Sequence, residues 1–259
     1  MLRRVDDLRG FTIAATDEEI GSVDDFYFDD KTWSIRYLIV DTGPWLVGKQ
    51  VLISPTAVEA PVWEAKILPV NLTKEQVENS PGIGVDQPVS RQHEIDLHNH
   101  YGWPGYWYAA PGMAAPMSGV YPAAIPPAAV ATPVDEQADP GEGKEEAQSD
   151  PHLRSVQEVL GYNIHATDGS IGHVEDFFAS ESDWRIRYVL IDTRNWLPGR
   201  KVLVGTDWID RIDWTERGLF VKVTQEQVRN SPEFDPKDPL TRRYEEDLYG
   251  HYHFQGYWF

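Results

Sequence analysis

Short hydrophobic runs separated by turn residues predict a β-rich fold. Residues 10–15 and 20–28 are two such runs, and the Thr-Asp turn after the first predicts a β-hairpin. Residues 33–40 form the central predicted strand, which is apolar on both faces, as in a strand that is covered on both sides. Residues 49–53 and 66–72 predict two further short strands. Five or six closely spaced strands of this kind predict a small antiparallel β-barrel.

The alternation along the central strand assigns its apolar side chains to two faces. A regular strand places Ile35, Tyr37 and Ile39 on one face. It places Leu38 and Val40 on the opposite face.

The whole pattern occurs twice in the chain. Residues 33–52 read WSIRYLIVDTGPWLVGKQVL, and residues 184–203 read WRIRYVLIDTRNWLPGRKVL. The same offset of 151 positions aligns residues 10–108 with residues 161–259 without a gap. Roughly 40 of these aligned pairs are identical, which indicates a duplicated unit of about 100 residues.

Two short helices are predicted after the strands of each copy. Thr73 with Gln76, and Thr224 with Gln227, have the spacing of a capping box, which begins a helix. A second helix is expected to begin at Ser90 and at Thr241. Its apolar stripe would dock on the barrel and consists of residues at four-residue spacing: His93, Leu97 and Tyr101, or Tyr244, Leu248 and Tyr252.

The segment between the two copies has the composition of a linker. We expect a first domain at residues 1–108, a linker at 109–153 and a second domain at 154–259. The linker is rich in Ala and Pro and then acidic, a composition that predicts an extended or disordered tether. Such a tether allows the two copies to pack as a pseudo-dimer or to bind two partner surfaces, and a homo-oligomer also stays open.

Charge and composition exclude several classes of protein. The formal net charge of −19 disfavours direct binding of nucleic acid. The chain has no cysteine, which excludes disulfides and thiolate metal sites and is compatible with a reducing compartment. No stretch predicts a membrane-inserted helix or a signal peptide, so we expect a cytoplasmic protein, with peripheral membrane association left open.

The sequence resembles the PRC-barrel family. The resemblance rests on the hairpin motif I-G-x-V, the strand W-x-I-R-Y followed by D-T, and the later V-L strand, and it covers residues 10–72 and 161–223. That family includes the cytoplasmic domain of the H subunit of purple-bacterial photosynthetic reaction centres and the C-terminal domain of the ribosome-maturation factor RimM. The resemblance implies two tandem small antiparallel PRC-type β-barrels, each with short C-terminal helices, that serve as protein-interaction modules.

Six polar residues recur at equivalent positions and are the first candidates for chemistry. Buried carboxylates beside arginine have shifted pKa values, so a proton relay or ligand site is one interpretation. The interpretation that we favour is structural, with arginines holding loop carboxylates and Asp41 capping its turn. The six residues are Asp25, Arg36 and Asp41 in the first copy, and Asp176, Arg187 and Asp192 in the second.

A histidine group near the second helix is the only metal-like pattern. His93, His98 and His100 lie close to Glu94 and Asp96, and imidazole and carboxylate are ordinary metal ligands. Only His100 has a histidine counterpart in the second copy, and no complete ligand motif is present. We therefore predict neither a metal nor another cofactor.

Tryptophans supply the candidate interaction residues. We expect Trp33 and Trp184 to fill the core of each barrel. A Trp-Leu pair occurs in a loop rich in Gly and Pro in each copy, and apolar side chains on a loop favour contact with a partner. These candidates are Trp45 and Leu46 in the first copy, and Trp196 and Leu197 in the second.

These features predict a non-enzymatic interaction or adaptor protein whose partners are proteins. Three alternatives stay open. The protein could be a membrane-peripheral accessory of a photosynthetic reaction centre or electron-transport complex, or a ribosome-assembly accessory. It could also bind a small ligand or metal, which would require a polar pocket.

Overall fold

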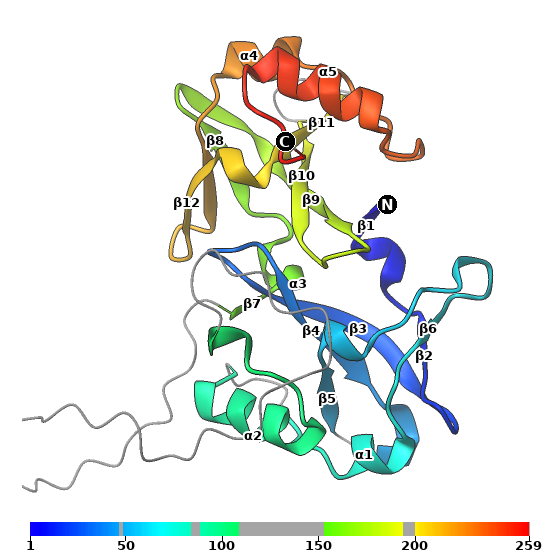
Figure 1. Ribbon diagram of the computed structural model, residues 1–259. Coiled ribbons are helices and arrows are strands. Elements are labelled where there is room, and N and C mark those ends of the chain that lie inside the picture. The colour runs from blue at the N-terminus through cyan, green and yellow to red at the C-terminus, as the bar shows by residue number, and fades with distance from the viewer. Residues whose placement is uncertain (47–48, 84–88, 109–152, 194–199, 259) are drawn as a thin grey trace, which may run out of the picture.

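Two β-sheets, one from each half of the chain, dominate the computed structural model (Figure 1). The structure describes residues 1–46, 49–83, 89–108, 153–193 and 200–258. The first sheet has the order β5-β4-β3-β2-β6, with β2 (Thr12–Ala14), β3 (Glu19–Asp29), β4 (Ile35–Asp41), β5 (Gln50–Ile53) and β6 (Ile67–Pro69). The second has the order β11-β10-β9-β8-β13-β12, with β8 (Asn163–Ala166), β9 (Gly169–Ser180), β10 (Ile186–Asp192), β11 (Lys201–Gly205), β12 (Ile209–Asp213) and β13 (Gly218–Val221).

The predicted β-rich fold is confirmed, and its strand pairing is more mixed than expected. The hairpins β2–β3 and β8–β9 are antiparallel, as the turn residues predict. However, β2 pairs with β6 in parallel, and β8 pairs with β13 in parallel. Each sheet is therefore mixed rather than purely antiparallel.

A β-bulge changes the predicted faces of the central strand. The register between β3 and β4 shifts between the pairs Tyr27–Tyr37 and Phe28–Ile35, so that Arg36 is an extra residue. Ile35 therefore packs in the same core cluster as Leu38 and Val40, and the predicted common face of Ile35 with Tyr37 is wrong.

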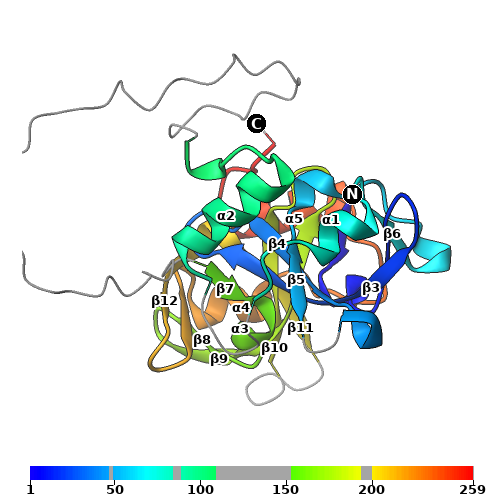
Figure 2. The ribbon, with the colours of Figure 1, turned by 90° about the horizontal axis from the view of Figure 1, so that it is seen from below.

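The helices that follow the strands of each half lie at opposite ends of the molecule (Figure 1). They are α1 (Lys74–Glu78) and α2 (Arg91–Tyr101) in the first half, and α4 (Gln225–Asn230) and α5 (Arg242–Tyr252) in the second. Both capping boxes are present, and Ser90 and Thr241 are the N-caps of α2 and α5, as predicted. Figure 2 shows α2 in front of β4 when the first half is seen from its outer end. Among the described residues, no helix has the length and apolar character needed to cross a bilayer.

Each half places its first strand on the sheet of the other half. Strand β1 (Leu2–Arg4) pairs with β9, and β7 (Leu153–Ser155) pairs with β3 (Figure 1). Leu153, the last residue of the predicted linker, is thus the first residue of a strand, and the rest of that predicted linker lies outside the described residues.

The starts of the two central strands also meet. The Ile35 N–H donates to the Trp184 carbonyl and the Ile186 N–H donates to the Trp33 carbonyl, each at 2.8 Å. Phe28 and Phe177, one from each half, have ring centroids 6.0 Å apart. The hydrophobic core therefore continues from one half into the other.

A chain that is cut between its halves is expected to remain one particle, because β1 and β7 each complete the sheet of the other half. A protease site placed within residues 120–140 of the full-length protein would be cut after purification. Native mass spectrometry and size-exclusion chromatography should then give the mass of the uncut protein, while the same cut sample should separate in denaturant. Dissociation of the halves at micromolar concentration would contradict this expectation.

Candidate interaction site

Asp25 and Asp176 bind the exchanged strands at the junction of the two halves. Asp25 is 4% exposed, and it accepts hydrogen bonds from Arg9 at 2.7 Å, from the Ser155 hydroxyl and from the Gln157 N–H at 3.2 Å. Ser155 belongs to β7 and caps α3 (Val156–Val159). The carboxylate of the first half thus holds the strand and helix that the second half contributes.

Asp176 does the same for the other exchanged strand. It is 1% exposed, and its Oδ2 accepts from Arg4 Nε of β1 at 2.7 Å. Its Oδ1 accepts from the N–H groups of Asp6 at 3.3 Å and Phe177 at 2.7 Å. The two buried carboxylates therefore have equivalent positions and equivalent structural roles.

Burial changes the acidity of both carboxyl groups. Desolvation raises the pKa of Asp176 to about 6, against the opposing effect of the Phe177 N–H and the Arg4 guanidinium. Desolvation also raises the pKa of Asp25, although the hydrogen bond from Ser155 opposes the shift.

The other four predicted polar residues serve local structure. Arg36 Nη2 donates to Asp29 at 3.2 Å, and its guanidinium lies 4.0 Å from the ring centroid of Tyr106. The Gly43 N–H donates to Asp41 Oδ1 at 2.8 Å, which is the Asx-type contact expected of that turn. In the described part of the chain, no hydrogen bond or ion pair joins Arg36 to Asp25 or Asp41, so the first copy does not assemble a relay from them.

The second copy repeats much of this arrangement. Arg187 donates to Asp183, and its guanidinium lies 4.3 Å from the ring centroid of Tyr257. The carboxylate of Asp192 lies 3.8 Å from His173 Nε2, which forms an ion pair only when the imidazole is protonated.

A buried glutamate in each copy was not predicted from the sequence. Glu94 of α2 is fully buried, and its Oε1 accepts from the hydroxyls of Tyr37 at 2.8 Å and Tyr106 at 2.6 Å. Its Oε2 lies 2.7 Å from Arg91 Nη1. This network attaches both the helix and the aromatic tail to β4, and the spacing of Glu94 beside the apolar stripe could have suggested its burial.

The second copy has the same network around Glu245. Its Oε1 accepts from Tyr188 at 2.8 Å and from Tyr257 at 2.7 Å, and its Oε2 lies 3.2 Å from Arg242. Repetition of all four residues of the network, one Glu, two Tyr and one Arg, indicates that the network is part of the fold.

The predicted histidine group is dispersed. His98 is buried and its Nε2 lies 2.8 Å from the Tyr37 hydroxyl, while His100 Nε2 lies 2.7 Å from the Gln76 carbonyl. Burial lowers the pKa of His98. Within the described ranges, no group of three or more His, Asp or Glu side chains has the arrangement of a metal site.

The predicted Trp-Leu loop is largely tied to its own half. Trp45 Nε1 donates to the Ile20 carbonyl at 3.0 Å, and the Lys74 ammonium lies 5.1 Å from the centroid of its ring. Trp45 and Leu46 are partly buried against the core. Their predicted counterparts Trp196 and Leu197 lie outside the described residues.

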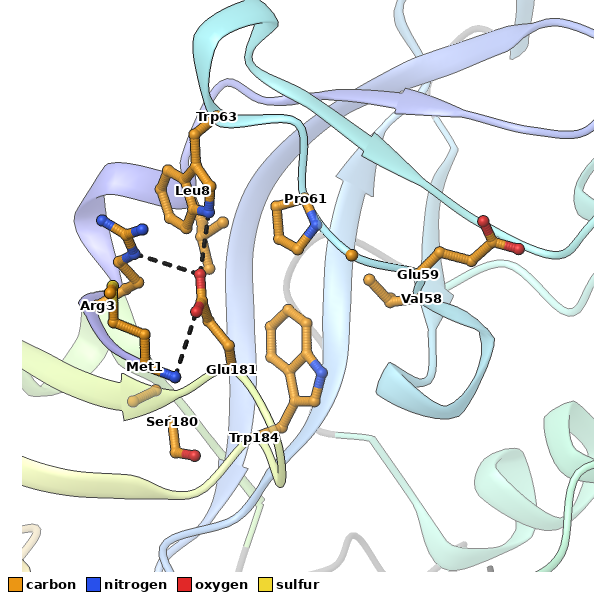
Figure 3. A pocket seen from close by; sticks show the side chains of 12 residues that line it. Met1, Arg3, Leu8, Val58, Glu59, Pro61, Trp63, Ser180, Glu181 and Trp184 are labelled. Atoms are coloured by element: carbon orange, nitrogen blue, oxygen red, sulfur yellow. Dashed lines mark hydrogen bonds and ion pairs between the residues drawn. The ribbon is translucent and has the colours of Figure 1, made fainter. Parts of the chain in front are cut away.

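A cavity of about 480 Å³ lies at the junction of the two halves (Figure 3). We call it the junction pocket. One wall comes from the segment between β5 and β6, another from the turn between β9 and β10, and a third from β1. Side chains that line it include Arg3, Val58, Pro61, Trp63, Glu181 and Trp184. Such a mainly apolar hollow with a few polar groups is typical of a binding site.

Trp63 is held in place by residues of both halves. Its Nε1 donates to Glu181 Oε1 at 2.9 Å, and Arg3 Nε donates to the same oxygen at 3.2 Å (Figure 3). The Arg3 guanidinium lies 4.4 Å from the Trp63 ring centroid, and Phe11 contacts the indole edge-to-face at 5.2 Å. The wall is therefore already positioned before any occupant binds, which lowers the entropy cost of binding.

Exposed apolar side chains gather at the same place. In the part of the chain that the structure describes, the large hydrophobic residues classed as exposed are Met1, which lines the pocket, and Val62, which is 43% exposed and lies between the lining residues Pro61 and Trp63. The stretch of residues 54–65 was not predicted as an interaction surface. Its run of Val, Ala, Pro, Val and Trp is the pattern that could have marked this surface.

The stability of the fold is expected to depend on pH through Asp176. Its folded-state pKa of about 6 lies above the ordinary 3.8, so the folded protein binds a proton between these values that the unfolded chain does not bind. The contribution of this group to the free energy of unfolding should therefore rise as the pH falls from 7 toward 4. Urea unfolding of the wild type and Asp176→Asn over this range measures it, because all other groups are shared. Parallel stability curves for the two proteins would count against the shifted pKa.

Removal of one hydroxyl from a buried network is expected to destabilise the protein. Tyr188→Phe removes a donor from the buried Glu245 and should lower the free energy of unfolding by about 1–3 kcal/mol. Tyr27→Phe is the matched control, because the Tyr27 hydroxyl has no hydrogen bond among the described residues. Equal losses for the two variants in urea unfolding would show that the hydrogen bond to Glu245 is not the cause.

Comparison with known families identifies the first half. Residues 2–77, from β1 to α1, match the family model of the PRC-barrel domain. A search of curated proteins returned no match. The second half repeats the sequence of the first at a constant offset and pairs the corresponding strands in the same registers. Residues 2–77 of the chain are therefore a PRC-barrel domain.

Proposed function

We propose that the protein is a cytoplasmic, non-enzymatic adaptor that binds a protein partner at the junction pocket. The observation that carries this proposal is the pocket itself, an apolar hollow with a positioned tryptophan wall and exposed hydrophobic residues at its edge. Interface hot spots have this composition, in which an aromatic anchor is surrounded by residues that exclude water.

The polar residues support a binding role more than a catalytic one. Asp25 and Asp176 are saturated by contacts to the exchanged strands, and Glu94 and Glu245 are saturated by tyrosines and arginines. Groups committed to structural contacts in this way are poorly placed to exchange protons with a substrate. The junction pocket, which is mainly apolar, is therefore the feature that best supports a function in binding.

The charge of the chain indicates which partners would be favoured. Its formal net charge is −19, so association with a basic protein would be steered electrostatically and would slow as the salt concentration rises. Proteins of membrane redox complexes and ribosomal proteins, the partner classes implied by the family resemblance, both include basic members. The identity of the bound protein would decide between them.

The pocket can be tested by site-directed photo-cross-linking in cells that naturally contain the protein. A benzoylphenylalanine at Ala60, which lines the pocket, should cross-link a discrete protein. The same residue at Ala65 is the matched control, since Ala65 is also exposed but does not line the pocket.

The cross-linked protein would then be purified and its affinity measured directly. Ala60→Trp fills the pocket from an exposed loop and should weaken binding by at least about tenfold, whereas Ala65→Trp should leave the affinity unchanged. Equal effects of the two substitutions, or no cross-linked product specific to position 60, would overturn the proposal.

A further inference from the structure

We infer that the junction pocket receives an aromatic side chain of the partner, presented next to a lysine or arginine. This inference rests on the proposed function and adds the chemistry of the partner segment to it. It follows from a comparison of the pocket with the equivalent place in the other half of the same chain.

Each residue of the first half has its counterpart 151 positions later in the second half. Trp184 corresponds to Trp33, and both have a positive φ, 52° and 57°. Ala179 corresponds to Phe28. Phe28 pairs with Ile35 across β3 and β4, and Ala179 pairs with the equivalent Ile186 across β9 and β10.

In the first half, the side chain of Phe28 covers the indole of Trp33. The Phe28 ring stacks on Trp33 with a centroid distance of 5.3 Å and an interplanar angle of 17°. Phe177 contacts the same indole at 6.3 Å. As a result Trp33 is buried and only 6% exposed.

The second half lacks the ring at the equivalent position. Ala179 has only a methyl group, and both Ala179 and Trp184 line the junction pocket. Trp184 is partly exposed and has no ring-to-ring contact with any described residue. The pocket is thus bordered by an indole face that in the first half is covered by a phenyl ring.

An aromatic side chain is the group that best restores this missing contact. Stacked aromatic pairs gain energy beyond the apolar area that they bury. A partner ring on Trp184 would also lie near Trp63, which Glu181 and Phe11 already hold in position. The occupant would therefore meet two indoles, one from each half of the chain.

Glu59 is the reason why we place a lysine or arginine next to the aromatic side chain of the partner. It lines the pocket, is exposed, and its carboxylate has no hydrogen bond or ion pair with any described residue. In Figure 3 the Glu59 side chain points away from the two indoles. A cation that pairs with it would sit at the rim, while the adjacent aromatic side chain enters the hollow.

The test uses full-length protein and three capped peptides as probes: Gly-Lys-Phe-Lys-Gly, Gly-Lys-Leu-Lys-Gly and Gly-Glu-Phe-Glu-Gly. Their dissociation constants would be measured by titration of the Trp63 and Trp184 indole N–H resonances. The Phe peptide with lysines should bind at least about tenfold more tightly than either of the other peptides.

Two variants block the pocket in different ways. Ala179→Phe places within the protein the ring that Phe28 supplies in the first half, and should abolish binding of the Phe peptide while the protein stays folded. Ala60→Trp blocks the same hollow from the surface and keeps the test decisive if Ala179→Phe fails to fold. Ala65→Trp should bind the peptide with unchanged affinity.

Equal affinity for the Phe and Leu peptides, or peptide binding that survives both blocking variants, would overturn the inference. These failures differ from failure of the proposed function. If a partner protein cross-links at position 60 and binds Ala60→Trp more weakly, but inserts no aromatic side chain, the adaptor role still holds and only the inference on the aromatic side chain fails. Absence of any pocket-dependent protein partner would overturn the adaptor role itself.

Discussion

The exchange of first strands between the two halves is the constraint on which the rest of the structure depends. The backbone N–H and C=O groups of a short strand such as β1 or β7 need hydrogen-bond partners from another strand. Strand β1 pairs with β9 and β7 pairs with β3, so each obtains these partners from the sheet of the other half. A buried aspartate accepts a hydrogen bond from a side chain of each exchanged strand, from Arg4 of β1 at Asp176 and from Ser155 of β7 at Asp25. The junction pocket exists because β1 brings Arg3 beside the β9–β10 turn and the Trp63 wall.

Local sequence patterns account for most of the fold. The hairpins and the capped helices follow from residues within about ten positions of one another, and the family resemblance follows from short motifs that occur in order along the chain. The exchanged strands could not be predicted in this way, because Leu2–Arg4 and Leu153–Ser155 have little hydrophobic pattern and find their partners more than 100 positions away. The bulge at Arg36 was missed for a related reason, since its register depends on the neighbouring strand and not on alternation along β4.

The candidate site shows a different limit of sequence reasoning. Residues that are the same in both copies, such as Asp25 with Asp176 or Tyr37 with Tyr188, turned out to hold the shared architecture together. The pocket includes a position at which the copies differ, Ala179 against Phe28. Such a position cannot be found from the residues that the two copies share, because the change from Phe to Ala looks like an ordinary substitution in the sequence.

Joining the two units in one polypeptide has a consequence for how the surface can specialise. In a symmetric dimer of identical subunits, every substitution appears twice, so a cavity opened at one place is opened at its mate, with twice the loss of packing. Here the phenyl ring of Phe28 is retained in one half while its counterpart is a methyl group in the other. Covalent linkage thus permits asymmetry within an architecture that is close to two-fold, because a loss of packing in one half is not repeated in the other.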